Sequence, residues 1–306
     1  MLWGLSGDAA LDSVRRELVR RAAPHVVLDQ RHIRGVRCDF NVATSMTGRL
    51  VLNRQLVDID EIGAIFVRPY DIRHVLRESS DVEALCGAVI LTRQLFAWMD
   101  VADGLVVNRP SAMISNSSKP YQSELIARNG FAIPDTLVTT SPDSARDFIA
   151  RHDHVIYKSV SDVRSTVSRV DPSDWDRIDD VANCPTQFQA YIAGTDWRVH
   201  VVGDDVYACE VRCVADDYRC AELQGLAVDI RPAVLPEPIE TRCHALAHGL
   251  NLPLAGIDLR RTADEEWYCF EVNPAPAFTY FEQATAQPLS AAIARLLSNL
   301  PNGLGA

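Results

Sequence analysis

Three residues near the C-terminus carry the oxygen-bearing side chains that magnesium prefers as ligands. Asp258 lies in an apolar run, and further along the chain Glu271 and Asn273 lie in a second one. A single residue separates Glu271 from Asn273, so on an extended strand their side chains point to the same face. The polar stretch between the two runs predicts a hairpin that sets all three side chains beside one another. The spacing therefore predicts a magnesium site.

A second interpretation of the same segment is a surface hairpin with a few acidic side chains on it. It explains poorly why a carboxylate lies inside each of two apolar strands, because unpaired charge is rarely buried. Pro274 and Pro276 follow at once and end the second strand, since proline cannot donate to the strand ladder. We favour the metal site.

Basic side chains at the ends of predicted elements could bind phosphate or another anion. Lys119 begins a predicted helix and Lys158 ends a predicted strand, which makes both candidates for binding phosphate as point charges. Arg68 and Asp71 follow the buried strand predicted at 63–67, where side chains line crevices in α/β sheets. For each residue the alternative is a solvated charge in an ordinary loop. For Arg68 and Asp71 the sequence leaves the two interpretations equally balanced.

A second hairpin is predicted around a turn at 203–205. Arg198 and His200 share one face of its first strand, and Glu210 and Arg212 share one face of its second. With an odd-length turn these faces coincide and form one charged surface. The alternative is an exposed face of salt bridges.

The composition is that of an ordinary globular protein, 47% hydrophobic and 23% charged. A net charge of -11 argues against bulk affinity for nucleic acid or an anionic membrane. No apolar run approaches the length of a membrane span, and the N-terminus lacks the features of a signal peptide, so we expect a cytoplasmic protein. The eight cysteines lack the close spacing of zinc ligands and are expected to be reduced structural thiols.

The order of helices and strands predicts a mixed α/β (α+β) chain whose first part ends near residue 110. The first part opens with a strand, a helix capped by Asp8 and a second strand, and it lacks the G-x-G-x-x-G pattern of dinucleotide-binding domains. The other expected elements are a turn at 46–49, a helix at 81–99, a strand at 131–139 and helices at 141–152, 237–250 and 285–300.

Taken in order, these features resemble the ATP-grasp ligases, and within them the RimK-like carboxylate–amine ligases. The resemblance runs from about Asn108 to Leu297. It rests on Gly194-Thr-Asp-Trp-Arg-Val-His-Val-Val-Gly203, Ala255-Gly-Ile-Asp-Leu259 and Phe270-Glu-Val-Asn-Pro274. It implies an ATP-grasp fold with an N-terminal α/β pre-ATP-grasp domain (1–110), a central lid-like subdomain (111–185) and a C-terminal sheet-and-helix subdomain (186–306). It also implies ATP and two Mg²⁺ ions as cofactors, with Mn²⁺ as an alternative ion.

The resemblance implies a nucleotide-binding role for several residues of this sequence. Lys119 and Lys158 would hold the ATP phosphates, and Ser161 and Arg164 would lie on the loop that covers them. Asp196 would bind the ribose hydroxyls. The adenine edge would meet backbone groups of four consecutive residues, Gln189, Ala190, Tyr191 and Ile192.

The remaining implied roles concern the transferred phosphate. Arg198 and Arg212 would contact it and the acyl phosphate that results. The metal ions would be bound by Asp258, Glu271 and Asn273. Phosphoryl transfer depends on positioning and charge neutralisation, which arginines and bridging metals supply. The implied reaction joins a carboxylate, activated as an acyl phosphate, to an amine or hydroxyl.

One segment departs from the family pattern. The phosphate-covering loop usually contains glycines, but Ser159-Val-Ser-Asp-Val-Arg-Ser165 has none. Together with Ser117-Ser-Lys-Pro-Tyr-Gln122, this version is most similar to the peptide-modifying branch. That branch includes the graspetide (microviridin-type) ligases, which join acidic side chains to hydroxyls or amines within a precursor peptide. In that case Arg68 and Asp71 could face the substrate.

Three hypotheses result. The first is an ATP- and Mg²⁺-dependent ligase acting on a precursor peptide with a leader segment. The second is a ligase that adds a free amino acid, such as glutamate, to a small molecule or a protein. The third is a nucleotide-binding scaffold without catalysis, against which the intact set of candidate residues argues. Members of the family often associate, so a homo-oligomer is also an expectation.

Overall fold

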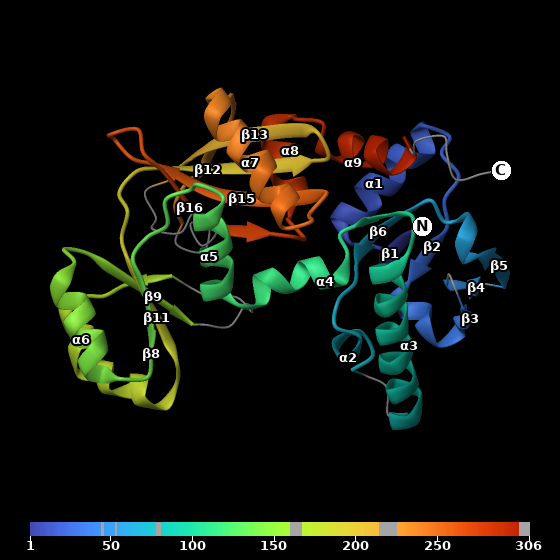
Figure 1. The fold of residues 1–306 in the computed structure, drawn as a ribbon, viewed down its shortest axis with the longest axis horizontal. Helices are drawn as coiled ribbons and strands as arrows, with labels where there is room; N and C mark the ends of the chain where they lie inside the picture. Colours follow the sequence, from blue (N-terminus) through green and yellow to red (C-terminus); the bar gives the residue numbers. More distant parts are fainter. Residues whose placement is uncertain (44–45, 53, 78–80, 160–166, 214–224, 300–306) are drawn as a thin grey trace.

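A computed structural model of the chain describes residues 1–43, 46–52, 54–77, 81–159, 167–213 and 225–299 (Figure 1). Its first part is built on a parallel sheet of four strands in the order β2-β1-β6-β7. The elements of this part are β1 (Leu2–Gly4), α1 (Ala9–Arg20), β2 (Val27–Asp29), β6 (Ala64–Arg68), α2 (Ile72–Val75), α3 (Val82–Val101) and β7 (Leu105–Val107). As predicted, Asp8 caps α1, where its carboxylate accepts a hydrogen bond of 2.8 Å from the Leu11 amide.

A small antiparallel sheet is inserted between β2 and β6. It contains β3 (Arg37–Val42), β4 (Met46–Leu52) and β5 (Gln55–Asp58), with the 3₁₀ helices η1 (Gln30–Gly35) and η2 (Ile59–Glu61) on either side in the chain. The turn expected at 46–49 is wrong, because these residues pair with β3. Gly48 suggested a turn, yet it lies inside the strand, where a Cβ would come 2.1 Å from the Asp39 carbonyl oxygen. Glycine within a strand often marks such a close approach of two backbones.

Helix α3 corrects the expectation that no apolar segment approaches the length of a membrane span. By length and composition alone, its 20 residues could span a membrane. A core helix of a soluble protein passes the same test, and five α3 residues are buried within the protein: Ala88, Thr92, Leu95, Trp98 and Met99. All of them except Thr92 belong to the apolar core beneath the first sheet. One side of α3 therefore packs into this core.

The central part is an antiparallel sheet in the order β10-β9-β11-β8. Its elements are β8 (Thr136–Thr139), α6 (Pro142–Arg151), β9 (Val155–Ser159), β10 (Ser168–Arg169), η4 (Pro172–Asn183) and β11 (Thr186–Ala190). The strand expected at 131–139 is shorter than predicted, and α6 begins and ends within a residue of the predicted 141–152. Because β11 belongs to this sheet, the boundary placed at residue 185 falls before its last strand.

The C-terminal part is an antiparallel sheet of five strands in the order β14-β13-β12-β15-β16. The strands are β12 (Thr195–Val202), β13 (Asp205–Arg212), β14 (Asp229–Ala233), β15 (Leu254–Arg261) and β16 (Trp267–Asn273). The helices packed with it are α5 (Lys119–Arg128), α7 (Glu237–Gly249), α8 (Phe278–Thr285) and α9 (Leu289–Ser298). The linker before α5 contains α4 (Pro110–Met113) and η3 (Ile114–Ser117). Helix α8 was not predicted, whereas α7 and α9 confirm helices expected at 237–250 and 285–300.

The two faces of the C-terminal sheet have different neighbours. One face packs against α5 and α7, around Ile126, Ile239 and Leu246. The other packs against α8 and α9, and this core continues into α1 and β6 of the first part. The first and last parts therefore share one apolar core, while the central sheet has its own core beneath α6. Figure 1 shows α6 on the outer side of that sheet, away from the C-terminal sheet.

Candidate active site

The predicted hairpin of oxygen ligands is present as β15 and β16. Asp258 pairs directly with Glu271, and Gly256 pairs with Asn273, so the three oxygen-bearing side chains share one face. The register shifts between Asp258 and Leu259, which marks a β-bulge. Bulges re-aim side chains, and this one lies immediately beside the candidate ligands. All three residues are partly buried.

Arg198 belongs to the same face and contacts the hairpin directly. It pairs with Asp258 across β12 and β15, and its Nη1 donates a hydrogen bond of 2.6 Å to Asp258 Oδ1. The guanidinium is 5.5 Å from the centre of the Phe281 ring, and the residue is only 5% exposed. Gly256 makes room for it, because a Cβ there would lie 2.2 Å from Arg198 Nη2. Sequence reasoning missed Gly256, although its place two residues before Asp258 was a signal.

His200 lies behind Arg198 in the interior. It is 1% exposed, and Arg198 Nε approaches its Nε2 at 3.5 Å. Burial, reinforced by the Arg198 charge, holds the pKa of His200 well below its ordinary value. The imidazole is therefore neutral and can accept the hydrogen bond from the guanidinium.

Arg212 does not join Arg198. The turn between β12 and β13 has two residues, since Val202 pairs with Asp205, and Arg198 therefore faces Cys209. Glu210 pairs with Trp197 on the opposite face. The prediction of one charged surface is thus wrong, because the assumed odd-length turn shifts the pairing by one residue and exchanges the faces. Arg212 is exposed and donates a hydrogen bond of 2.7 Å to Glu210.

The predicted adenine and ribose residues lie where the central and C-terminal sheets meet. Arg260, which sequence reasoning also missed, donates from Nε to Asp196 Oδ1 at 2.7 Å and from Nη1 to the Ile192 carbonyl at 2.8 Å. Its guanidinium lies 5.6 Å from the centre of the Tyr191 ring, and that of Arg169 lies 4.3 Å from it. Arg260 follows Asp258 by two residues and so shares its face, which was the available signal.

The central sheet presents Lys158 on the face that points away from the core beneath α6. Lys158 pairs with Gln187, and Gln189 lies on the same face of β11. Both glutamines are buried, at 2% and 3% exposure, and among the described residues neither Oε1 has a hydrogen-bond partner. Buried polar atoms normally find a partner, so these two fit a site for a polar ligand. Ala190, next in β11, donates its amide to the Asp135 carbonyl at 2.9 Å. Ser161 and Arg164 lie outside the described residues.

Lys119 is the first residue of α5, which packs against β16. Ser118 is at the N-cap position, but its side chain makes no capping hydrogen bond. The lysine thus lies at the start of a helix that contacts the strand of Glu271 and Asn273, whereas Lys158 belongs to the central sheet.

Arg68 and Asp71 have different surroundings. The Arg68 side chain is 13% exposed, lies 3.4 Å from the Asp8 carboxylate and donates a hydrogen bond of 3.2 Å to the Pro276 carbonyl. It is therefore not a solvated loop arginine. Asp71 is exposed, caps α2 and pairs with Arg73 at 2.6 Å, and this pairing lowers the pKa of the Asp71 carboxyl. These contacts give Asp71 a structural role as the cap of α2.

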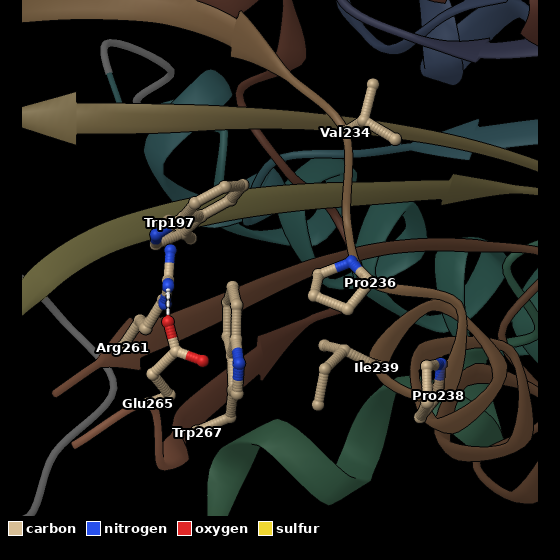
Figure 2. A pocket seen from close by; sticks show the side chains of 8 residues that line it. All are labelled: Trp197, Val234, Pro236, Pro238, Ile239, Arg261, Glu265 and Trp267. Carbon is tan, nitrogen blue, oxygen red and sulfur yellow. Dashed lines mark hydrogen bonds and ion pairs between the residues drawn. The ribbon is translucent and has the colours of Figure 1, made fainter.

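A pocket of about 340 Å³ lies on the opposite face of the C-terminal sheet (Figure 2). Trp197 and Trp267 meet edge to face there, with ring centres 5.0 Å apart, beside the ion pair of Arg261 and Glu265. None of the predicted site residues is among those that line it: Trp197, Val234, Pro236, Pro238, Ile239, Arg261, Glu265 and Trp267. It is separate from the row of Arg198, Asp258 and Glu271.

The donor set fits a metal that is bound together with phosphate. Among the described residues, no three His, Cys, Asp or Glu side chains gather closely enough to hold a metal unaided. Magnesium is commonly bound by one or two carboxylates, with substrate phosphates and water completing the shell. Asp258 and Glu271 with the Asn273 amide match that pattern.

An antiparallel C-terminal sheet carrying this row, joined to a smaller central sheet that carries a lysine, is the arrangement of an ATP-grasp protein. The family model of the RimK-like ATP-grasp domain matches residues 116–297, more than half of the chain. The chain therefore belongs to the RimK-like ATP-grasp family, whose members bind ATP and magnesium.

Solved structures share the fold over nearly the whole chain. The macrocyclase MdnC from Microcystis aeruginosa MRC, bound with precursor peptide MdnA, is 20% identical with a TM-score of 0.81 and covers 97% of this chain and 98% of its own. A RiPP-associated ATP-grasp ligase from Chryseobacterium gregarium, in complex with ADP and a leader and core peptide, is 23% identical with a TM-score of 0.81 and covers 100% and 98%. At these identities the likeness concerns the fold.

A curated relative is also similar in sequence. Beta-citrylglutamate synthase B of Danio rerio is 26% identical over an alignment of 212 residues, which covers 65% of this chain and 52% of the relative. The chain thus spans about half the length of this relative.

Proposed function

We propose that this protein is an ATP- and magnesium-dependent ligase that activates a carboxylate of a peptide. The γ-phosphoryl group of ATP passes to the carboxylate, giving an acyl phosphate and ADP. An amine or hydroxyl then attacks the acyl carbon and expels inorganic phosphate, leaving an amide or ester. The observation that carries the proposal is the row of Arg198, Asp258 and Glu271 across three adjacent strands.

In this proposal the nucleotide lies between the central and C-terminal sheets. Lys119 and Lys158 bind its phosphates from the two sides, Asp196 binds the ribose, and the segment 189–192 binds adenine. The amide oxygens of Gln187 and Gln189, which have no hydrogen-bond partner in the described part of the chain, support a polar ligand at this place. Ser161 and Arg164 of the covering loop belong to the same proposal.

Arg198 would stabilise the negative charge of the phosphoryl group in transfer, with Arg212 assigned to the acyl phosphate. Asp258, Glu271 and Asn273 would hold two magnesium ions, or manganese in their place. A metal bound there would neutralise charge on the phosphate oxygens. The role of Arg198 has the stronger support, because it is buried and contacts Asp258, whereas Arg212 is exposed.

A peptide substrate is the preferred acyl donor. The solved structures of MdnC and of the Chryseobacterium ligase contain a precursor peptide and a leader and core peptide respectively, and they cover 97% and 100% of this chain. Arg68 would contribute to binding an anionic group of that substrate, with Asp71 nearby. Because the reaction consumes ATP, we place it in the cytoplasm.

A free amino acid is the alternative substrate, and one observation favours it. The curated relative, beta-citrylglutamate synthase B, carries the name of a ligase of a small molecule. Its identity of 26% extends over only 65% of this chain, whereas the peptide-bound structures match nearly all of it.

An assay of ADP release by the purified chain distinguishes a peptide substrate from a free amino acid. Peptides rich in Asp, Glu, Ser, Thr and Lys should stimulate ADP release and lose water on ligation, which mass spectrometry detects as a loss of about 18 Da. Stimulation by free glutamate alone would favour the amino-acid ligase. Glu271→Gln should abolish ADP release while leaving the fold intact, and unchanged release in this variant would refute the metal assignment.

A further inference from the structure

Gln122 joins helix α5 to the strand of candidate metal ligands. Gln122 is 2% exposed, and its side chain makes two hydrogen bonds with one residue, Val272, besides a longer one of 3.5 Å from Nε2 to Asn116 Oδ1. Nε2 donates to the Val272 carbonyl at 2.8 Å, and the Val272 amide donates to Oε1 at 3.0 Å. A primary amide is the side chain that can donate and accept in this parallel fashion, so it substitutes for a neighbouring strand.

The contact falls at a place where no strand of the described chain lies beside β16 on its outer side. β16 is the last strand of its sheet, and its other side pairs with β15. The outward backbone groups of an edge strand otherwise remain unpaired. Further along this edge the Cys269 amide donates to the Ala132 carbonyl at 2.9 Å, and at Val272 the partner is the Gln122 side chain.

Val272 is the residue between Glu271 and Asn273. Holding both its N–H and its C=O fixes the peptide groups on either side, and with them the directions in which the two flanking side chains point. The same helix begins at Lys119, so one amide sets the candidate phosphate-binding lysine relative to two candidate metal ligands. Partners of this kind orient metal ligands and tune metal affinity.

We propose that Gln122 is a positioning residue of the metal site, which holds Glu271 and Asn273 in register with Lys119. The inference rests on the proposed function, because it takes these residues to bind metal and phosphate. It adds Gln122, which would act through Val272 and would bind neither the metal nor the phosphate itself.

The chain contains a matched control. Gln30 is 0% exposed and makes the same pair of hydrogen bonds, donating from Nε2 to the Tyr70 carbonyl at 2.8 Å and accepting from the Tyr70 amide at 2.7 Å. It lies in the first part of the chain. Loss of the Gln30 amide removes the same interactions from a buried site without touching β16.

The experiment measures binding of Mn²⁺ in the presence of ADP, by the electron paramagnetic resonance of free Mn²⁺, without turnover. Gln122→Leu removes both hydrogen bonds to Val272 and the longer one to Asn116, and Gln122→Glu keeps the acceptor for the Val272 amide. Circular dichroism confirms that each variant is folded. We expect both to raise the dissociation constant of Mn²⁺ by about tenfold or more, while Gln30→Leu leaves it unchanged.

Folded Gln122 variants that bind Mn²⁺ as tightly as the wild type would overturn the proposal. An equal loss in Gln30→Leu would also overturn it, since the effect would then come from general destabilisation. If the wild-type chain bound no Mn²⁺ in the presence of ADP, the proposed function itself would fail, and the inference with it. Weaker binding in Gln122→Leu than in Gln122→Glu supports the role of the amide acceptor.

Discussion

Arg198 Nη1 lies 2.6 Å from Asp258 Oδ1, and the two residues are direct partners across β12 and β15. Asp258 in turn is the direct partner of Glu271 on β16. A buried guanidinium and two carboxylates thus follow one another across the sheet. This row supplies both signs of charge that a phosphoryl group and its metal ion require.

Replacing Arg198 should damage both stability and activity. In Arg198→Leu, Asp258 loses a partner in a largely buried pair, which should lower the free energy of unfolding by about 2–3 kcal/mol. ADP release should fall by about 10²-fold or more if the guanidinium stabilises the transferring phosphate. Urea denaturation and an ADP-release assay measure the two effects. Arg198→Lys retains the charge, and full activity in that variant would argue against a need for the planar guanidinium.

A methyl group at Gly256 should displace Arg198. The Cβ would lie 2.2 Å from Arg198 Nη2 and 2.6 Å from Pro276 Cβ, so Gly256→Ala should destabilise the protein by about 1–3 kcal/mol and reduce ADP release. Gly87→Ala is the control, because a Cβ in that helix meets nothing within 4 Å and should stabilise α3 by about 0.5–1 kcal/mol. Thermal unfolding distinguishes the two. Normal activity in Gly256→Ala would show that Arg198 can move without cost.

Arg260 should affect ATP binding more than turnover. Arg260→Met removes the contacts to Asp196 and to the Ile192 carbonyl, each of which shapes the proposed nucleotide site. Loss of hydrogen bonds to charged groups predicts a rise of about tenfold in KM for ATP, with a smaller change in kcat. Arg261→Met is the matched control on the opposite face of β15, and it should leave KM unchanged. Equal effects of the two substitutions would contradict the assignment.

The buried His200 should make stability depend on pH. Its pKa in the folded protein is well below the ordinary value, so below about pH 6.5 the unfolded state takes up a proton that the folded state does not. The neutral His200 therefore makes its full contribution to the free energy of unfolding above that pH. As the pH falls below it, the free energy of unfolding decreases by up to about 1.4 kcal/mol per pH unit. Urea denaturation between pH 5 and 8 measures the slope, which should become shallower in His200→Phe. An unchanged slope would assign the titration to other groups.

The sequence predicted much of this site because its residues are local. Glu271 and Asn273 share a face by the two-residue period of a strand, and a short polar turn predicted the hairpin that places Asp258 opposite Glu271. The cap at Asp8 and the helices around α3, α6, α7 and α9 followed from equally local signals. The turn predicted at 46–49 was wrong because a glycine such as Gly48 is typical both of turns and of closely paired strands.

Contacts between distant segments could not be predicted. Arg68 and the Pro276 carbonyl are 208 positions apart, and Asn108 donates hydrogen bonds of 2.6 and 2.5 Å to the carbonyls of Leu254 and Pro274. Asn108 is 1% exposed and ties the end of β7 to β15 and to the residue that follows β16. The sequence alone does not show that this asparagine is buried, or which backbone groups it binds.

The sequence by itself determined which residues share a strand face and therefore which chemistry the C-terminal hairpin can perform. Only the tertiary structure decided which faces meet. A two-residue turn placed Arg198 beside Cys209 and sent Arg212 to the other side, because a shift of one residue exchanges the faces of a strand. Likewise, the packing of α5 against β16 turned Gln122 from an ordinary helix residue into the partner of Val272, since only folding brings an edge strand and that helix together.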